Sequence, residues 1–166
     1  MKYLFLLAVT ALFLGGCSSA ADNANAEHIE LVNKYIKAVE EMDFEGMGQF
    51  LDENYMGLGP SFGDTIYKAD AVANWKENVT NLYKKIKYNR SKSAAVNIPD
   101  GDNKGNWVGN WAELTIDYQS GSSVTIWANT NYLVENGKII RSFTFYNEAD
   151  ALRQMGYKIV PPAATE

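Results

Sequence analysis

The sequence predicts an α+β fold in which three N-terminal helices pack on a strongly curved antiparallel sheet. Up to about residue 83, apolar residues recur at spacings of three and four, and beyond that point they alternate with a period of two. Turn signals divide the second half into successive strands, and Asn136-Gly137 is the clearest hairpin signal among them. Helices followed by a meander of strands indicate helices laid on one face of a sheet.

Three helices are expected before the change of period. The first covers Glu27–Glu41, where one apolar stripe consists of Ile29, Val32, Tyr35, Ile36 and Val39. Asp43 can cap a second, short helix that carries Phe44, Met47, Phe50 and Leu51 inward. A third helix begins at Asp70 and runs to about Tyr83.

Five strands and a final helix complete the expected fold. A first strand over Tyr55–Leu58 leads into an irregular loop at Gly59-Pro60. The meander strands are expected at Ile86–Ile98, Trp107–Tyr118, Val124–Val134 and Ile139–Tyr146. A short helix over Ala149–Met155 follows the last strand.

The N-terminus has the pattern of a bacterial lipoprotein signal. Lys2 gives a positive start, Tyr3–Leu14 is apolar, and the run Leu14-Gly15-Gly16-Cys17 resembles a lipobox. The resemblance implies a lipid on Cys17 and cleavage before it. The apolar stretch is too short for a membrane-spanning helix, which needs about 20 residues.

This signal predicts a protein of the bacterial cell envelope, anchored to a membrane through the lipid on Cys17. Ser18 and Ser19 follow the cysteine without an aspartate, a pattern that resembles outer-membrane sorting. The expected division of the chain is a signal peptide over 1–16, a flexible spacer over 17–26, one domain over 27–156 and a tail over 157–166.

Composition excludes several function classes. The formal net charge is −5, and the acidic balance argues against nucleic-acid binding, which needs clustered Lys and Arg. Cys17 is the only cysteine, so an acylated chain has neither a disulfide nor a thiol nucleophile. The single histidine, His28, is expected to be solvated near a helix start. We therefore expect no metal site and no cofactor.

The order of elements resembles the NTF2-like superfamily, especially its SnoaL-like branch, over about Glu27–Gly156. The residues that carry the resemblance are Tyr35 with Asp43 eight positions later, Gly59-Pro60, the hairpin Tyr132–Ile140, and Phe145–Glu148 with Leu152–Gly156. The resemblance implies a cone in which a bent sheet wraps helices around a cavity. Members include ketosteroid isomerases, polyketide cyclases, dehydratases and binding proteins, and the fold does not choose among them.

The isomerase branch needs a carboxylate base, a tyrosine and a protonated acid. Matching the family pattern puts Tyr35 on the tyrosine position, Gly59 on the base position and Thr130 near the acid position. Glycine cannot move a proton and threonine is not an acid. The resemblance therefore implies that this chain lacks isomerase chemistry of that kind.

Three carboxylates remain as candidate acids. Glu148 follows the last strand, where cyclase-like members often place an acid, although it is also expected as a solvated strand-end residue. Glu113 and Asp117 share one strand face, and hydrophobic burial favours the opposite face, with Leu114, Ile116 and Tyr118, as the inner one. A bulge would reverse that assignment.

Aromatic residues are the stronger signal, because they make up 13% of the chain and many fall in strands. The candidate pocket residues, placed inward by alternation and helix position, are Tyr35, Trp75, Thr130, Tyr132, Ser142, Thr144 and Tyr146. An aromatic lining with a few hydroxyls suits a small apolar or aromatic molecule. The alternative is that these aromatics simply fill the cone.

The opposite face of the sheet predicts a homodimer. It would carry Trp127, Leu133, Phe143 and Phe145, and an exposed apolar face of that size should be covered. Three functions stay open: a lipid-anchored binding domain, an enzyme of cyclase, dehydratase or isomerase type, and a protein-interaction module of the envelope.

Overall fold

The computed structural model describes residues 20–158 and residue 160. The elements in chain order are α2 (Ala20–Glu40), α3 (Phe44–Phe50), β1 (Leu51–Leu58), β2 (Thr65–Tyr67), α4 (Lys68–Asn81), β3 (Tyr83–Ile98), β4 (Gly105–Tyr118), β5 (Ser123–Glu135), β6 (Lys138–Tyr146) and α5 (Glu148–Gln154). The expected signal peptide, the lipidation site Cys17 and residues 161–166 of the tail lie outside the described residues.

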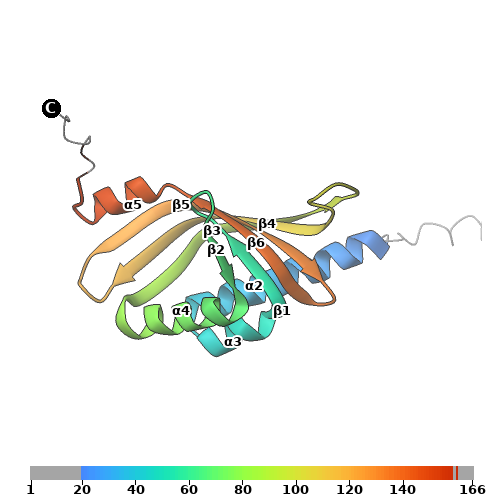
Figure 1. The fold of residues 1–166 in the computed structure, drawn as a ribbon, viewed down its shortest axis with the longest axis horizontal. Helices are drawn as coiled ribbons and strands as arrows, with labels where there is room; N and C mark the ends of the chain where they lie inside the picture. The colour runs from blue at the N-terminus through green and yellow to red at the C-terminus, as the bar shows by residue number, and fades with distance from the viewer. Residues whose placement is uncertain (1–19, 159, 161–166) are drawn as a thin grey trace, which may run out of the picture.

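The strands form one six-stranded sheet in the order β2-β1-β6-β5-β4-β3. The sheet curves around α2, α3 and α4, and α5 packs beside β5 (Figure 1). This confirms the α+β class and the curved sheet. The expectation of a purely antiparallel sheet is wrong, because β1 pairs in parallel with β6. Strand β2 follows β1 across a short loop and pairs with it in antiparallel, but β6 lies far from β1 in the sequence, so no hairpin imposes an antiparallel direction on that pair.

Several boundaries differ from those that the sequence predicts. Helix α2 begins at Ala20 rather than Glu27, so the described part of the expected flexible spacer is helical. The segment is rich in alanine and carries Asp22 in the first turn, and both features favour a helix. Leu51 opens β1 instead of closing the second helix, and Tyr83 opens β3 instead of closing α4.

A bulge in β3 contributes to the bend of the sheet. The pairing of β3 with β4 shifts register between Asn89 and Lys92, and Arg90 has a φ of 51°. Asn110 of β4 is 2% exposed, and its Nδ2 donates to Ser91 Oγ at 2.8 Å and to Ser93 Oγ at 3.0 Å. A bulge bends a strand and raises its twist, so this one helps to wrap the sheet around the helices.

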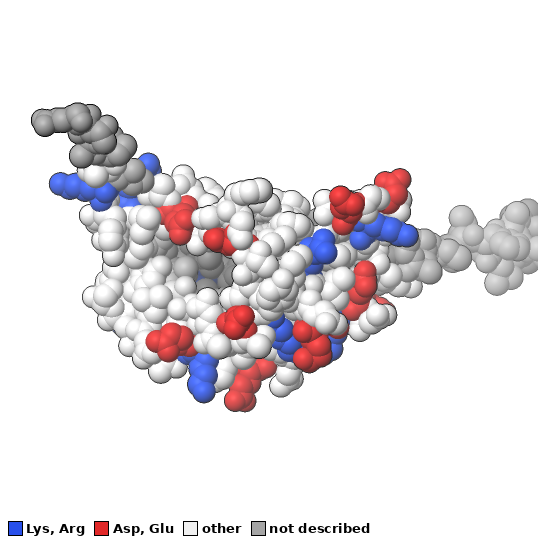
Figure 2. Space-filling model, in the orientation of Figure 1, with Lys and Arg blue, Asp and Glu red and all other residues white. Residues whose placement is uncertain are grey.

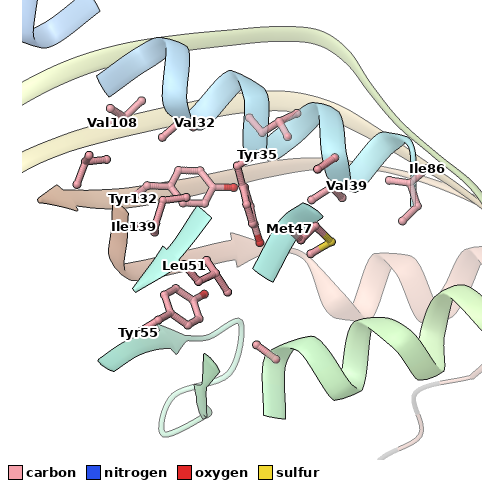
Figure 3. Packing of buried hydrophobic residues seen from close by; sticks show 14 residues of the cluster. Val32, Tyr35, Val39, Met47, Leu51, Tyr55, Ile86, Val108, Tyr132 and Ile139 are labelled. Atoms are coloured by element: carbon pink, nitrogen blue, oxygen red, sulfur yellow. The ribbon is translucent and has the colours of Figure 1, made fainter. Parts of the chain in front are cut away.

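The hydrophobic core fills one part of the space between the helices and the sheet (Figure 3). Val32 of α2, Val108 of β4 and Ile139 of β6 are all fully buried there. Tyr35 and Tyr132 lie side by side in the same cluster, with ring centroids 5.6 Å apart. These two tyrosines also border an internal cavity, so they join the packed core to the candidate site.

Candidate functional site

A cavity of about 390 Å³ lies inside the cone, beside the core. Side chains of α2, α4 and α5 and of five strands line it, and Figure 2 shows a hollow on this face of the molecule. The structure brings all seven candidate pocket residues to this wall: Tyr35, Trp75, Thr130, Tyr132, Ser142, Thr144 and Tyr146. That they bind a ligand stays a prediction.

Four more tyrosines line the cavity, and sequence reasoning did not assign them to the pocket: Tyr55, Tyr83, Tyr88 and Tyr118. Two signals were available. Tyr88 alternates with Ile86, and Tyr118 alternates with Leu114 and Ile116 on the strand face already expected to point inward. Tyr55 had no such signal, because apolar and polar residues do not alternate along its strand, β1.

The inner end of the cavity is built from buried hydroxyls. Tyr55 Oη and Ser142 Oγ share a hydrogen bond of 2.7 Å. The ring of Tyr35 meets that of Tyr132 edge to face, with an interplanar angle of 66°. Burial raises the pKa of Tyr35 and of Tyr132 well above the ordinary tyrosine value. The phenols are therefore neutral at physiological pH, and they offer hydrogen bonds rather than charge.

The outer end of the cavity holds a group of side chains that we name the outer cluster: Trp75, Tyr83, Tyr118, Tyr146 and Glu148. The rings of Trp75 and Tyr83 are 6.0 Å apart, and those of Tyr83 and Tyr118 are 5.7 Å apart, each pair edge to face. Burial raises the pKa of Tyr83 to about 12. Burial also raises the pKa of Tyr146, and the Glu148 carboxylate adds to that effect.

Glu148 is the only carboxylate among the described residues that line the cavity. It is exposed and begins α5, and its Oε2 accepts a hydrogen bond of 3.4 Å from Ser61 Oγ. The Ser61 amide donates in turn to Asp64 Oδ2 at 3.3 Å, so the loop between β1 and β2 places a second acid nearby. Both acids are exposed, and Asp64 is not among the residues that line the cavity.

The other two candidate acids are outside the cavity. Glu113 forms an ion pair with Arg90 at 3.5 Å, and Asp117 accepts a hydrogen bond of 2.7 Å from Ser123 Oγ. Strand β4 pairs with β5 without a shift of register, so the alternation expected from burial is kept. The bulge lies in β3 instead, and Leu114 and its inner neighbours line the cavity.

The isomerase constellation is not assembled. Gly59 has a φ of +92° and does not line the cavity, and a Cβ at this position would overlap the carbonyl oxygen of Thr144. Thr130 does line the cavity, where its Oγ1 shares a hydrogen bond of 3.3 Å with Thr144 Oγ1. Neither position supplies a group that could take up a proton from a substrate.

The outer face of the sheet is only partly the apolar surface that the sequence predicts. Trp127 is 67% and Phe145 is 54% exposed, and Phe143 is half-buried against Trp107. Leu133 was expected on this exposed face, but it is 4% exposed. It is covered because the turn between β3 and β4 folds over this end, where Trp107 Nε1 donates to the Asn103 carbonyl at 2.7 Å.

Within residues 20–158, no group of three or more His, Cys, Asp and Glu side chains is arranged to hold a metal ion. His28 lies in α2, away from the cavity wall, and its Nδ1 is buried with no partner among the described residues. It is therefore not the freely solvated residue that the sequence predicts. No described helix combines the length and the apolar character needed to cross a membrane.

Comparisons with known proteins show the fold. No family model matches the chain, and no curated protein matches it. Among solved structures, a candidate polyketide cyclase from Xanthomonas campestris is 16% identical with a TM-score of 0.65, over 78% of this chain and 97% of that one. An NTF2-like protein from Burkholderia xenovorans is 15% identical with a TM-score of 0.59, over 78% and 96%.

A protein from Catenulispora acidiphila with a ketosteroid isomerase-like fold, solved in complex with trimethylamine, is 13% identical. Its TM-score is 0.61, over 80% of this chain and 98% of that one. The chain therefore has the NTF2-like fold. Identities this low carry no activity or ligand from these proteins to this one.

Proposed function

We propose that this protein is a lipid-anchored domain that binds a small apolar or aromatic molecule in its cone, without isomerase chemistry. The observation that supports this most is the cavity wall. It combines seven tyrosines and one tryptophan with hydroxyls, and its inner end has no carboxylate or histidine among the described residues. Cavities of this size, mostly apolar with a few placed polar groups, are typical of small-molecule sites.

A neutral fluorescent probe, N-phenyl-1-naphthylamine, tests the binding function. We expect it to bind the protein with increased emission. Ala128→Phe places a ring inside the cavity, from a wall residue of β5, and should weaken this binding at least tenfold. Thr125→Phe adds the same ring to the exposed face of the same strand and is the matched control. Equal binding by both variants would place the probe elsewhere and count against the proposal.

An enzyme of the cyclase, dehydratase or isomerase type is the second candidate. Its one supporting observation is Glu148, which reaches the cavity wall beside Tyr146. The carboxylate is exposed, and it accepts a hydrogen bond from Ser61. An envelope interaction module with a filled cone has no comparable support, because the cone contains a cavity.

The membrane anchor is part of the proposal, and the lipobox resemblance at Cys17 supports it. We expect the full chain to fractionate with bacterial membranes, and specifically with the outer membrane. Cys17→Ser should release it into the soluble fraction, whereas Ser18→Ala, one residue further on, should not. A Cys17→Ser protein that stays with the membrane would contradict lipid anchoring.

We also propose that the exposed part of the outer face pairs two copies of the chain. Trp127 and Phe145 remain as its apolar centre, with Phe143 at its border and Leu133 buried beneath. At micromolar concentration, sedimentation equilibrium should show a dimer, and Trp127→Glu should give a monomer of unchanged fold. A wild-type protein that sediments only as a monomer would contradict this proposal.

A further inference from the structure

The outer end of the cavity combines aromatic rings with negative charge, and no Lys, Arg or His is among the described residues of its wall. Four of the five members of the outer cluster are aromatic and the fifth is Glu148, while Asp64 lies within electrostatic reach of Tyr146. We propose that the outer cluster binds the cationic amine group of the ligand, while the apolar body of the same molecule occupies the inner cavity. The inference rests on the proposed binding function and names the class of ligand.

The charges at the site exclude anions and leave room for a cation. The described residues that line the cavity include no lysine, arginine or histidine. Glu148 and Asp64 form no ion pair with any described residue. An anion entering here would lose its hydration without a cationic partner, whereas a cation would gain the Glu148 carboxylate in the wall and Asp64 near Tyr146.

The arrangement of the rings suits a cation as well. Trp75, Tyr83 and Tyr118 follow one another around the wall, and successive rings are turned by 60° and 63°. The three rings therefore form a bent wall rather than a flat stack. A cation within about 6 Å of such rings is attracted by the negative faces of their π systems, and tryptophan and tyrosine are the favoured partners.

A purely neutral ligand would leave these features unused. It would gain from the apolar inner cavity, but the carboxylates at the entrance would contribute nothing to its binding. A tertiary or quaternary ammonium group gains from both ends of the site. Such a group is weakly hydrated compared with a primary ammonium, so its desolvation costs less. The ligand class is therefore an amine that carries an apolar or aromatic body.

Three probes of nearly equal shape separate charge from shape: benzyltrimethylammonium, its neutral isostere neopentylbenzene, and the anion phenylmethanesulfonate. Each displaces N-phenyl-1-naphthylamine from the full-length protein in a competition experiment. We expect the cation to bind at least tenfold more tightly than the neutral isostere, and the anion to bind least. The advantage of the cation should shrink as salt is added, because the two carboxylates are near solvent.

The outcomes distinguish this inference from the function beneath it. A neutral isostere that binds as tightly as the cation, or more tightly, overturns the cation site and leaves the apolar pocket standing. Displacement by none of the three probes, when the fluorescent probe itself binds, also overturns the cation site. Failure of the fluorescent probe to bind would overturn the proposed function itself.

Two matched pairs of variants assign the effect to the outer cluster. Tyr118→Leu should weaken binding of the cation about threefold to thirtyfold, the range expected from one cation–π contact, whereas Tyr118→Phe keeps the ring and should change it little. Glu148→Gln should weaken the cation and not the neutral isostere. Glu135→Gln removes the same charge at the far end of β5 and should affect neither probe. Equal losses for cation and isostere in Glu148→Gln would contradict the assignment.

Discussion

Replacing Gly59 by alanine should destabilise this protein by about 2–5 kcal/mol, although the residue is neither in the core nor on the cavity wall. Two costs add at this position. The backbone has a φ of +92°, which a residue with a Cβ adopts only at a cost of about 1–3 kcal/mol. The new Cβ would also overlap the carbonyl oxygen of Thr144, and backbone atoms of a paired strand cannot move aside cheaply.

Gly63 separates these two costs. Its φ is +94°, nearly the same as that of Gly59, but nothing lies within 4 Å of where its Cβ would be. Gly63→Ala should therefore cost only the backbone part, about 1–3 kcal/mol. Urea unfolding of both variants measures the difference. If the two variants lose the same stability, the close approach of Gly59 to β6 does not exist in solution.

The close approach of Gly59 to the Thr144 carbonyl also bears on function. The resemblance inferred from the sequence matches Gly59 to the position of the catalytic base in ketosteroid isomerases, and a simple view is that one substitution would restore a base. The structure argues against this view, because β1 passes so close to Thr144 that no side chain fits. The absence of a base is therefore part of how the two strands pack. This agrees with the proposal that the cavity serves binding.

The alternation of strands explains why so much of the pocket could be predicted. Thr130 and Tyr132 on β5 face Thr144 and Ser142 on β6 in one unbroken stretch of antiparallel register. Once one tyrosine points inward, the period of two places its neighbours as well. Tyr35 and Trp75 follow from the apolar stripes of their helices in the same manner.

The errors arise where a contact distant in sequence decides the structure. Nothing in the sequence of β1 indicates that it pairs in parallel with β6. Leu133 alternates as an outward residue and does lie opposite Trp107, but the turn between β3 and β4 then covers both. The helical start at Ala20 has a different cause: a small polar composition indicates flexibility, but the alanines of this segment favour a helix.

Two buried isoleucines should show whether the cavity is a real space in solution. Ile139 is fully buried in the packed core, and Ile139→Ala should cost about 3–4 kcal/mol, because it removes packing and leaves a hole. Ile126 is 6% exposed but lines the cavity, so part of its surface has no neighbours to lose. Ile126→Ala should therefore cost about 1–2 kcal/mol less than Ile139→Ala.

Ligand binding makes the comparison sharper. A molecule in the cavity gives Ile126 the neighbours that it lacks in the empty protein, while Ile139 is untouched. Saturating N-phenyl-1-naphthylamine should stabilise the wild-type and Ile139→Ala proteins equally, because their sites are the same. It should stabilise Ile126→Ala by a different amount, because that wall has changed. Equal costs for the two isoleucines without probe, and equal stabilisation with it, would mean that the side chains collapse into the cone. A collapsed cone would remove the physical basis for a binding function.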